Sequence, residues 1–438
     1  AQTLVEDYLK KHPEHKMKNE LVDFLKNKIQ LILNTNRIGV ILPLSGEFSE
    51  EGQRLASGIR YAEYEAKQEN GDAINAETVI RDSESNMIRA IREFQDLERD
   101  PNIVCFIGEL ENIITAGLAG VAQASKIPLV APTATDNGLA NLGSYVFQAS
   151  PDLEEQARAL ARYAFKMDSL RTFVTIAPHD AYGQQMVDAF SEEIDRLGGE
   201  IITQRWYYGV PENLGRLFKS IREIAFRRGL EDTLRLKLPN FAQLDKDSLW
   251  KDFNRRFMLE NNENESIVEL SSSYPVNNID GVFLPIYQED IQFVARQLKY
   301  FNINAQILGG EFWYLQDLEK NKQLLPYIDH TIFVSSYYFD PESFEYKNFR
   351  NRFRKKMGTT PEKWELFGYD TAKMIFSMLD QKKIGREQMR ELLVTKTPFL
   401  GHKGLIRFQK GKRVNTAVHI LQITGTKIRK LPHEEISF

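Results

Sequence analysis

The hydrophobic positions of the chain alternate between two periodicities, and the alternation starts near residue 37. Ile38–Leu42 is a short apolar run typical of a buried strand, and it is followed by Gly52–Gln68, where apolar residues recur at helical spacing. The same order of strand and helix continues as far as Leu129–Ala131. Buried strands that alternate with amphipathic helices predict a parallel sheet covered by helices on both faces.

The pattern restarts after Ser150-Pro151. A helix is predicted over Leu153–Lys166, a strand over Phe173–Ala177 and a helix over Gln184–Leu197, and strand and helix alternate up to Gln306–Leu308. Two successive sets of this kind favour two similar lobes over one long sheet. The tail is predicted to contain two helices and to close with β-rich segments, at Phe344–Met357, Trp364–Leu379, Gly404–Phe408 and Thr416–Ile423.

Two segments stand apart from this alternation. Residues 1–36 show two short amphipathic helical patterns, and Tyr8–Pro13 resembles the close of a tetratricopeptide-type repeat. A plain helical arm is the alternative interpretation. Residues 212–279 are longer than one helical crossover requires and contain 11 basic and 11 acidic residues. We interpret about 229–279 as an insertion with some helix of its own.

Composition narrows the class of protein. The 438 residues are 42% hydrophobic and 27% charged, which is ordinary for a globular chain. The net charge of −4 shows no basic excess, so a dedicated nucleic-acid-binding protein is not expected. One cysteine rules out an intramolecular disulfide, and no apolar run approaches the ~18 residues that a membrane helix requires.

The motifs of common enzymes are missing from the sequence. There is no G-x-S-x-G, no H-E-x-x-H, and no G-x-G-x-x-G after the first strand. The seven histidines are scattered without metal-ligand spacing, and Cys105 lies in an apolar strand where we expect a buried structural thiol. We therefore predict a chain that is not an enzyme and that holds neither a metal nor a cofactor.

A series of short motifs occurs in a fixed order along the chain. Together they span about residues 37–425, and in this order they resemble the type I periplasmic binding proteins of the leucine/isoleucine/valine-binding branch. The motifs are Arg37–Gly46, Asp82–Ser85, Phe106–Gly108, Ile127–Thr135, Tyr145–Gln148, Asp180–Gly183, Asp280–Leu284 and Gly368–Asp370.

This resemblance implies a fold and a division of the chain. The family has two Rossmann-like lobes joined by three crossover strands, and ligand binds in the cleft between the lobes. We expect lobe 1 to contain residues 37–147 and 311–400, and lobe 2 to contain 148–310 and 401–438 with the insertion. Residues 1–36 would form an N-terminal helical arm.

The resemblance also implies ligand contacts in lobe 1. In amino-acid-binding relatives the ligand carboxylate is held by hydroxyls and backbone N–H groups from the loops after the third and fourth strands. Those loops contain Asn112 and Thr133-Ala134-Thr135 here. Glu109 and Glu111 depart from the pattern, because acids beside a carboxylate site would repel the ligand. The alternative roles are strand termination for Thr133 and Thr135, and helix capping for Asn112.

The remaining predicted contacts lie mostly in lobe 2. Tyr182 matches the ligand-contacting tyrosine, and Glu289 or its neighbour Asp290 matches the acid that pairs with a ligand ammonium. Glu51 stands where an aromatic residue often covers the ligand, and Trp313 either lines the cleft or braces the hinge. The complete predicted ligand-binding set is Ser45, Glu51, Asn112, Thr133, Ala134, Thr135, Tyr182, Tyr287, Glu289, Glu311 and Trp313.

Two functions remain open from the sequence. The first is an extracytoplasmic solute-binding protein that takes an amino acid or related polar ligand for transport or sensing, with an ABC transporter permease as its partner. The second is a cell-envelope lipoprotein regulator that uses the same fold for protein contacts, similar to the outer-membrane lipoprotein activators of penicillin-binding proteins. Both imply a periplasmic or cell-envelope location.

Overall fold

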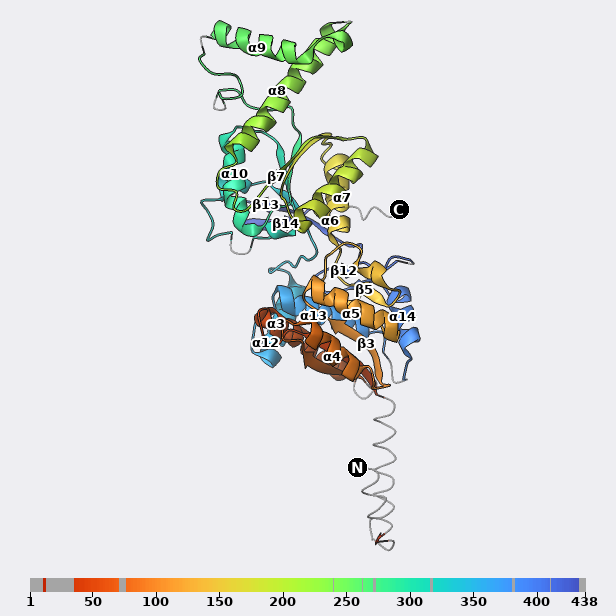
Figure 1. Cartoon of the computed structure of the whole chain (residues 1–438). Coiled ribbons are helices and arrows are strands. Elements are labelled where there is room, and N and C mark those ends of the chain that lie inside the picture. Colours follow the sequence, from red (N-terminus) through yellow and green to blue (C-terminus); the bar gives the residue numbers. More distant parts are fainter. Residues whose placement is uncertain are drawn as a thin grey trace. The chain divides into compact units, whose positions relative to one another are not determined.

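The computed structural model describes residues 11–12, 35–70, 76–238, 240–261, 263–270, 273–315, 318–379, 383–409 and 411–432. These residues divide into two compact units, each built from two separated stretches of sequence. Unit 1 contains the chain up to Asp152 and Phe339–Thr416, and unit 2 contains Leu153–Tyr338 and the chain from Ala417 onward. Each unit is a sheet flanked by helices (Figure 1).

The sheet of unit 1 is parallel throughout its described strands. Their order across the sheet is β2-β1-β3-β4-β5. Strands β1, β3 and β4 are nearly continuous apolar runs, as expected where both faces of a sheet are covered, whereas the edge strand β2 is more polar and only partly buried. Their bounds are Asn36–Leu42 (β1), Ala76–Asp82 (β2), Ile103–Gly108 (β3), Leu129–Ala131 (β4) and Val146–Gln148 (β5).

Successive side chains of β1 enter different cores. Val40 packs with side chains of α3, α12, α13 and α14, whereas Ile41 packs with those of α4 and α5. Cys105 of β3 is fully buried, which confirms the expected structural thiol. The helices are α3 (Ser49–Asn70), α4 (Met87–Leu97), α5 (Asn112–Ser125), α12 (Phe344–Met357), α13 (Lys363–Phe376) and α14 (Arg386–Thr395).

Helices α3 and α13 approach each other closely at two glycines. A Cβ on Gly58 would lie 2.0 Å from the backbone oxygen of Glu365, and a Cβ on Gly368 would lie 2.1 Å from that of Leu55. The Nε of Arg54 donates to Oε1 of Glu365 over 2.9 Å beside this contact. Residues more than 300 positions apart in sequence therefore complete unit 1.

The sheet of unit 2 is mixed. Parallel strands β7, β6, β8, β9 and β10 are followed by antiparallel β13 and β14 at one edge. Helices α6 and α7 contribute to one core of this unit, and α8 and α10 to another. The bounds are Leu153–Lys166 (α6), Thr172–Pro178 (β6), Ala181–Leu197 (α7), Glu200–Tyr207 (β7), Gly215–Lys237 (α8), Gly281–Leu284 (β8), Ile291–Tyr300 (α10), Gln306–Gly309 (β9), Ile332–Ser335 (β10), His419–Thr424 (β13) and Lys427–Lys430 (β14).

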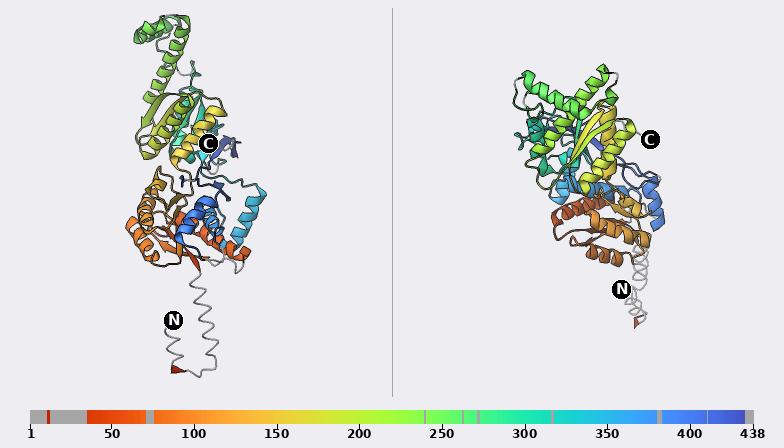
Figure 2. Two further views of the ribbon diagram at one scale, coloured as in Figure 1. Left: turned by 90° about the vertical axis from the view of Figure 1, so that its right-hand side faces the viewer. Right: turned by 45° about the horizontal axis from the view of Figure 1, so that its top comes forward.

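The predicted insertion belongs to unit 2 and has its own small core. Helix α8 runs to Lys237, past the expected start of the insertion, and α9 (Lys246–Asn261) follows it. Both views in Figure 2 show α8 extending away from the sheet of unit 2 with α9 at its far end. Trp250, Phe257 and Ile267 are buried against one another at this end.

A buried arginine holds the insertion to the body of unit 2. Arg222 of α8 is fully buried, and its guanidinium donates hydrogen bonds to four backbone carbonyl oxygens. Three of these oxygens belong to the loop after α9, and one belongs to the end of α10. The acceptors are Ile267, Val268, Tyr274 and Phe301.

The unit boundaries differ from the predicted lobe boundaries at all three crossings. Residues 148–152, assigned to lobe 2 from the sequence, lie in unit 1. Residues 311–338, assigned to lobe 1 from the sequence, lie in unit 2 because β10 pairs with β9 and β13. Residues 401–416, assigned to lobe 2, lie in unit 1, where Asp370 accepts backbone hydrogen bonds from His402 and Lys403. The chain crosses between units three times, as the fold requires.

The helical arm predicted over residues 1–36 lies almost wholly outside the described residues. Within the described part, no helix combines the length and the apolar character that a membrane crossing requires. The remaining short elements are α11 (Leu325–Ile328), β11 (Phe399–Leu400) and β12 (Leu405–Ile406).

Candidate ligand-binding loops

The predicted contacts of unit 1 gather at one edge of its sheet. Parallel strands present their carboxyl ends at the same edge: Ser45 follows β1, Asn112 begins α5 after β3, and Thr133–Thr135 follow β4. Glu51 lies close by in sequence, in the first turn of α3, where a carboxylate is favoured by the helix dipole.

Asp82, at the end of β2, organises the loop after β1. Its carboxylate accepts hydrogen bonds from the backbone N–H groups of Leu44, Ser45 and Glu84, and from the hydroxyl of Ser45 over 2.7 Å. Burial opposes ionisation of this carboxyl, but the hydrogen bonds outweigh it and hold the pKa of Asp82 below its ordinary value. The hydroxyl of Ser45 therefore stabilises this loop through its hydrogen bond to Asp82.

Glu109, directly after β3, occupies the donors of its own loop. One carboxylate oxygen accepts from the backbone N–H groups of Leu110 and Glu111, over 2.7 and 3.0 Å. The other oxygen accepts from the hydroxyl of Ser83 over 2.5 Å. The side chain is fully buried, and this burial raises the pKa of Glu109 despite the three hydrogen bonds. The loop thus has the donors of a carboxylate site, and a carboxylate of this chain fills it.

The loop after β4 is also internally bonded. The side-chain oxygen of Asn112 accepts from the backbone N–H of Thr135 over 2.9 Å, and its amide nitrogen donates to Asp136 over 2.8 Å. The hydroxyl of Thr133 donates to the backbone oxygen of Leu110 over 3.0 Å. Ala134 is buried. These residues come together as predicted, but their contacts join the two loops to each other.

The second set of predicted contacts lies at the carboxyl edge of the unit 2 sheet. Tyr182, Tyr287 and Phe312 form an aromatic cluster with ring centroids 5.0 to 5.3 Å apart. The hydroxyl of Tyr287 donates to Asp180 over 2.9 Å, and Asp180 also caps α7 by accepting from the backbone N–H of Gly183. The cap fixes the first turn of α7, which contains Tyr182.

The hydroxyl of Tyr182 is buried without a hydrogen-bond partner among the described residues. Burial is the main cause that raises the pKa of Tyr182 well above its ordinary value, and the nearby Glu311 and Asp180 carboxylates add to it. A Cβ added to Gly310 would lie 2.5 Å from this hydroxyl, so a larger residue there would require the Tyr182 side chain to shift. An unpartnered buried hydroxyl is costly, and it marks a position where a ligand could supply a partner.

Two other predicted residues are structural. Asp290 is buried and accepts from the hydroxyl of Tyr207 over 2.6 Å, while its neighbour Glu289 is exposed. Trp313 is fully buried in the core of unit 2 and donates to the backbone oxygen of Leu284. It therefore braces the fold. Glu311 accepts from the backbone N–H of Ser336 over 3.4 Å.

No ligand-binding role was predicted for Asp82, Asp180 or Phe312. Asp82 and Asp180 each begin a motif that carried the family resemblance, so their positions were a usable signal. Phe312, whose side chain is 41% exposed beside two tyrosines, gave no such signal. Within the described ranges, no group of His, Cys, Asp and Glu side chains is arranged to hold a metal ion.

Comparison with known proteins gives a family match for part of the chain. Residues 35–221 match the model of the family described as periplasmic binding protein. Among curated proteins, the penicillin-binding protein activator LpoA of Photobacterium profundum is 24% identical over 198 residues, which cover 44% of this chain and 30% of that protein. The same activator of Vibrio antiquarius is 25% identical over 225 residues, covering 50% and 35%. The matches thus span about a third of these relatives.

Solved structures resemble the chain over most of its length. A putative branched-chain amino acid ABC transporter protein from Rhodospirillum rubrum matches with a TM-score of 0.71 at 14% identity, covering 91% of this chain and all of that one. A substrate-binding protein from Desulfitobacterium hafniense in complex with Leu matches with a TM-score of 0.60 at 19% identity, with the same coverage. The chain is therefore similar to the periplasmic binding proteins over residues 35–221 and has the type I periplasmic-binding-protein fold.

Proposed function

We propose that this chain is a non-enzymatic regulator of the cell envelope that acts by binding a protein partner. The observation that carries the proposal is the Glu109 carboxylate, which occupies the N–H and hydroxyl donors of its loop. The curated relatives are named as activators of a penicillin-binding protein, so a penicillin-binding protein is the partner to test.

The filled loop weighs against binding a free amino acid through its carboxylate in unit 1. An incoming carboxylate that used these donors would have to displace Glu109, whose own carboxylate would then lose three hydrogen bonds inside a fully buried position. A buried carboxylate without hydrogen bonds costs several kcal/mol, on the order of what a small ligand gains on binding. A function that needs no small ligand avoids this cost.

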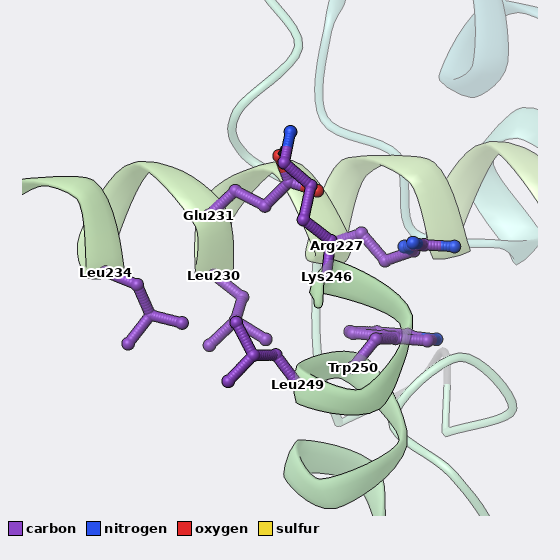
Figure 3. A pocket seen from close by; sticks show the side chains of 7 residues that line it. All are labelled: Arg227, Leu230, Glu231, Leu234, Lys246, Leu249 and Trp250. Atoms are coloured by element: carbon purple, nitrogen blue, oxygen red, sulfur yellow. Dashed lines mark ion pairs between the residues drawn. The ribbon is translucent and has the colours of Figure 1, made fainter. Parts of the chain in front are cut away.

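The projecting pair of helices α8 and α9 is the surface that we assign to the partner. Leu236, near the end of α8, is 89% exposed, and Leu259, near the end of α9, is 73% exposed. Figure 3 shows Leu230 and Leu234 of α8 facing Leu249 of α9 across a small pocket between the helices. Leu236 and Leu259 do not line this pocket, so we assign the contact to these two exposed leucines themselves, because exposed apolar side chains on a projecting element can form a protein contact surface.

The proposal is tested by measuring binding of the full chain to a purified penicillin-binding protein from the same organism. We expect Leu236→Asp and Leu259→Asp to weaken binding at least tenfold, because each places a charge in an apolar contact. Leu400→Asp is the matched control, since Leu400 is 77% exposed in unit 1. Equal binding by all three variants and the native chain would place the contact elsewhere, and no binding by the native chain would reject this partner.

A second candidate function is solute binding, with an ABC transporter as partner. It is favoured by the unpartnered Tyr182 hydroxyl and by the nearby carboxylates of Asp180 and Glu311, which suit a ligand with a positive charge. Thermal unfolding against amino acids and polyamines tests it, because a ligand at 100 times its Kd adds about 2.7 kcal/mol. Solute binding predicts a shift that Tyr182→Phe abolishes. If no compound shifts the unfolding temperature, solute binding is rejected and the envelope regulator remains the proposed function.

A further inference from the structure

Helix α12 concentrates positive charge on the surface of unit 1. Six of its 14 residues are basic and only Glu345 is acidic, in a chain whose net charge is −4. The apolar side of the helix is buried, with Tyr346, Phe349 and Phe353 in the unit 1 core. These buried side chains fix the orientation of the helix, which is labelled in Figure 1, and leave its basic residues on the solvent side. Its exposed basic residues are Arg352, Arg354, Lys355 and Lys356.

The nearby carboxylates are engaged by other groups. Glu65 pairs with Arg352 over 3.1 Å but also with Lys373 over 3.4 Å, and it accepts from the hydroxyl of Tyr369. Among the described residues, no ion pair joins Arg354, Lys355 or Lys356 to a carboxylate. The Nζ of Lys356 instead lies 4.0 Å from the ring centre of Tyr64 on α3.

The stability of the helix does not account for this charge. Like charges four residues apart, such as Arg350 with Arg354 and Arg352 with Lys356, destabilise a helix. The helix dipole favours basic residues only in the last turn, so it accounts for Arg354, Lys355 and Lys356 but not for Arg350 and Arg352. An external anion is the partner that such a face would fit.

We propose that this basic face adsorbs to a membrane surface rich in anionic phospholipid headgroups. The basic face consists of Arg352, Arg354, Lys355 and Lys356, with the exposed Arg60 on α3 one turn before Tyr64. A convex helix surface suits a plane of headgroups, because adsorption of this kind needs no complementary groove. Tyr64 is 36% exposed beside Lys356 and is the kind of amphipathic ring found at membrane interfaces. Because Tyr346, Phe349 and Phe353 are buried and Phe344 is the one large apolar side chain of α12 that is exposed, we expect the contact to be mainly electrostatic.

This inference goes beyond the proposed function, since adsorption to lipid neither requires nor excludes a protein partner. It is tested by sedimenting the full chain with vesicles of phosphatidylethanolamine containing phosphatidylglycerol, and with vesicles of phosphatidylcholine alone. We expect binding only to the anionic vesicles, and stronger binding at 10 mM than at 150 mM salt, because salt screens exposed charges. The triple variant Arg354→Gln, Lys355→Gln and Lys356→Gln should weaken the partition roughly a hundredfold.

The matched control removes the same charge from unit 2. Lys299, Lys322 and Lys430 are exposed basic residues of unit 2, and their triple change to Gln should leave vesicle binding unchanged. Circular dichroism and thermal unfolding establish that both triple variants fold. The inference is overturned if the native chain ignores anionic vesicles at low salt, or if the two triple variants lose binding equally. Binding to poly-glutamate but not to anionic vesicles would also overturn it, in favour of an acidic protein.

Discussion

The hydroxyl of Ser83 donates to the carboxylate of Glu109 over 2.5 Å, at the carboxyl edge of the unit 1 sheet. Two backbone N–H groups point at the other oxygen of the same carboxylate. In this loop the chain supplies both the hydrogen-bond donors and the carboxylate that accepts from them. The loop is consequently preorganised around Glu109, and its stability depends on that carboxylate.

Replacing Glu109 should therefore destabilise unit 1. Glu109→Ala leaves three buried donors without an acceptor, so we expect the free energy of unfolding to fall by about 1–3 kcal/mol or more. Added acetate or formate should partly restore the unfolding temperature of the variant, because a small carboxylate can enter the vacated position. Glu111→Ala is the control, since the donors stay satisfied. Equal unfolding temperatures for the native chain and Glu109→Ala would contradict this account.

Arg222 should be required for the attachment of the insertion. Arg222→Met would leave four buried carbonyl oxygens without their donor, and we expect a loss of roughly 3 kcal/mol together with faster proteolysis near residues 263–274. Arg222→Lys should be intermediate, because an ammonium cannot reach acceptors spread over two elements. Arg216→Met, at an exposed position of α8, should leave both measurements unchanged. Similar proteolysis of the two Met variants would show that Arg222 does not hold the loop.

Asp370 and His402 should give opposite pH dependences. Burial raises the pKa of Asp370 to about 6 from 3.8, so its contribution to stability falls as pH rises through this window. Burial lowers the pKa of His402 to about 4 from 6.5, so its contribution is present above pH 6.5 and falls as pH drops towards 4. In the native chain the two effects oppose each other.

Single variants separate the two effects. His402→Phe lacks the His402 contribution, so we expect it to become less stable, relative to the native chain, as pH rises from about 4 to 6.5. Asp370→Asn lacks the Asp370 contribution, so it should become relatively less stable as pH falls from about 6 to 3.8. Unfolding temperatures measured between pH 4 and 7 test both expectations. If the difference from the native chain changes with pH in the same direction for both variants, the assignment is disproved.

The contact between α3 and α13 should not tolerate a methyl group. Gly58→Ala would place a Cβ 2.0 Å from the backbone oxygen of Glu365, and we expect a loss of about 1–3 kcal/mol or more as the helices move apart. Gly120→Ala on α5 is the control, because no atom lies within 4 Å of the added Cβ there. That change should stabilise the chain by about 0.5–1 kcal/mol. A stable Gly58→Ala chain would show that the helices are less closely fitted.

The sequence predicted most helices and strands because their periodicities are clear. The strands β1 and β3 are buried apolar runs, and the packed face of α3 is regular. The unit boundaries were harder to predict, because β10 is only four residues long and was not assigned from the sequence. The insertion boundary was misplaced because α8 continues through Leu230 and Leu234 without a cap that marks an end at 229.

The candidate site was only partly predictable. The order of the motifs predicted that the loops of unit 1 and the tyrosines of unit 2 lie at the carboxyl edges of their sheets, and the structure places them there. The sequence showed Glu109 only as an acid in an unusual place, because the direction of backbone N–H groups leaves no trace in residue types. The roles of Asp290, the alternative to Glu289, and of Trp313, expected either to line the cleft or to brace the hinge, stayed open for the same reason: their partners, the Tyr207 hydroxyl and the Leu284 carbonyl oxygen, are far away in sequence.

The pairing of α3 with α13 has a consequence for how the chain is made. The α3 surface around Gly58 is translated roughly 300 residues before the α13 surface that covers it, which at cellular rates means a delay on the order of tens of seconds. Throughout that delay the nascent unit 1 exposes Leu55 and Ile59, which are fully buried in the finished fold. The chain should therefore depend on holding chaperones during synthesis, and circular permutation that joins 339–416 directly to 35–152 should relieve that dependence.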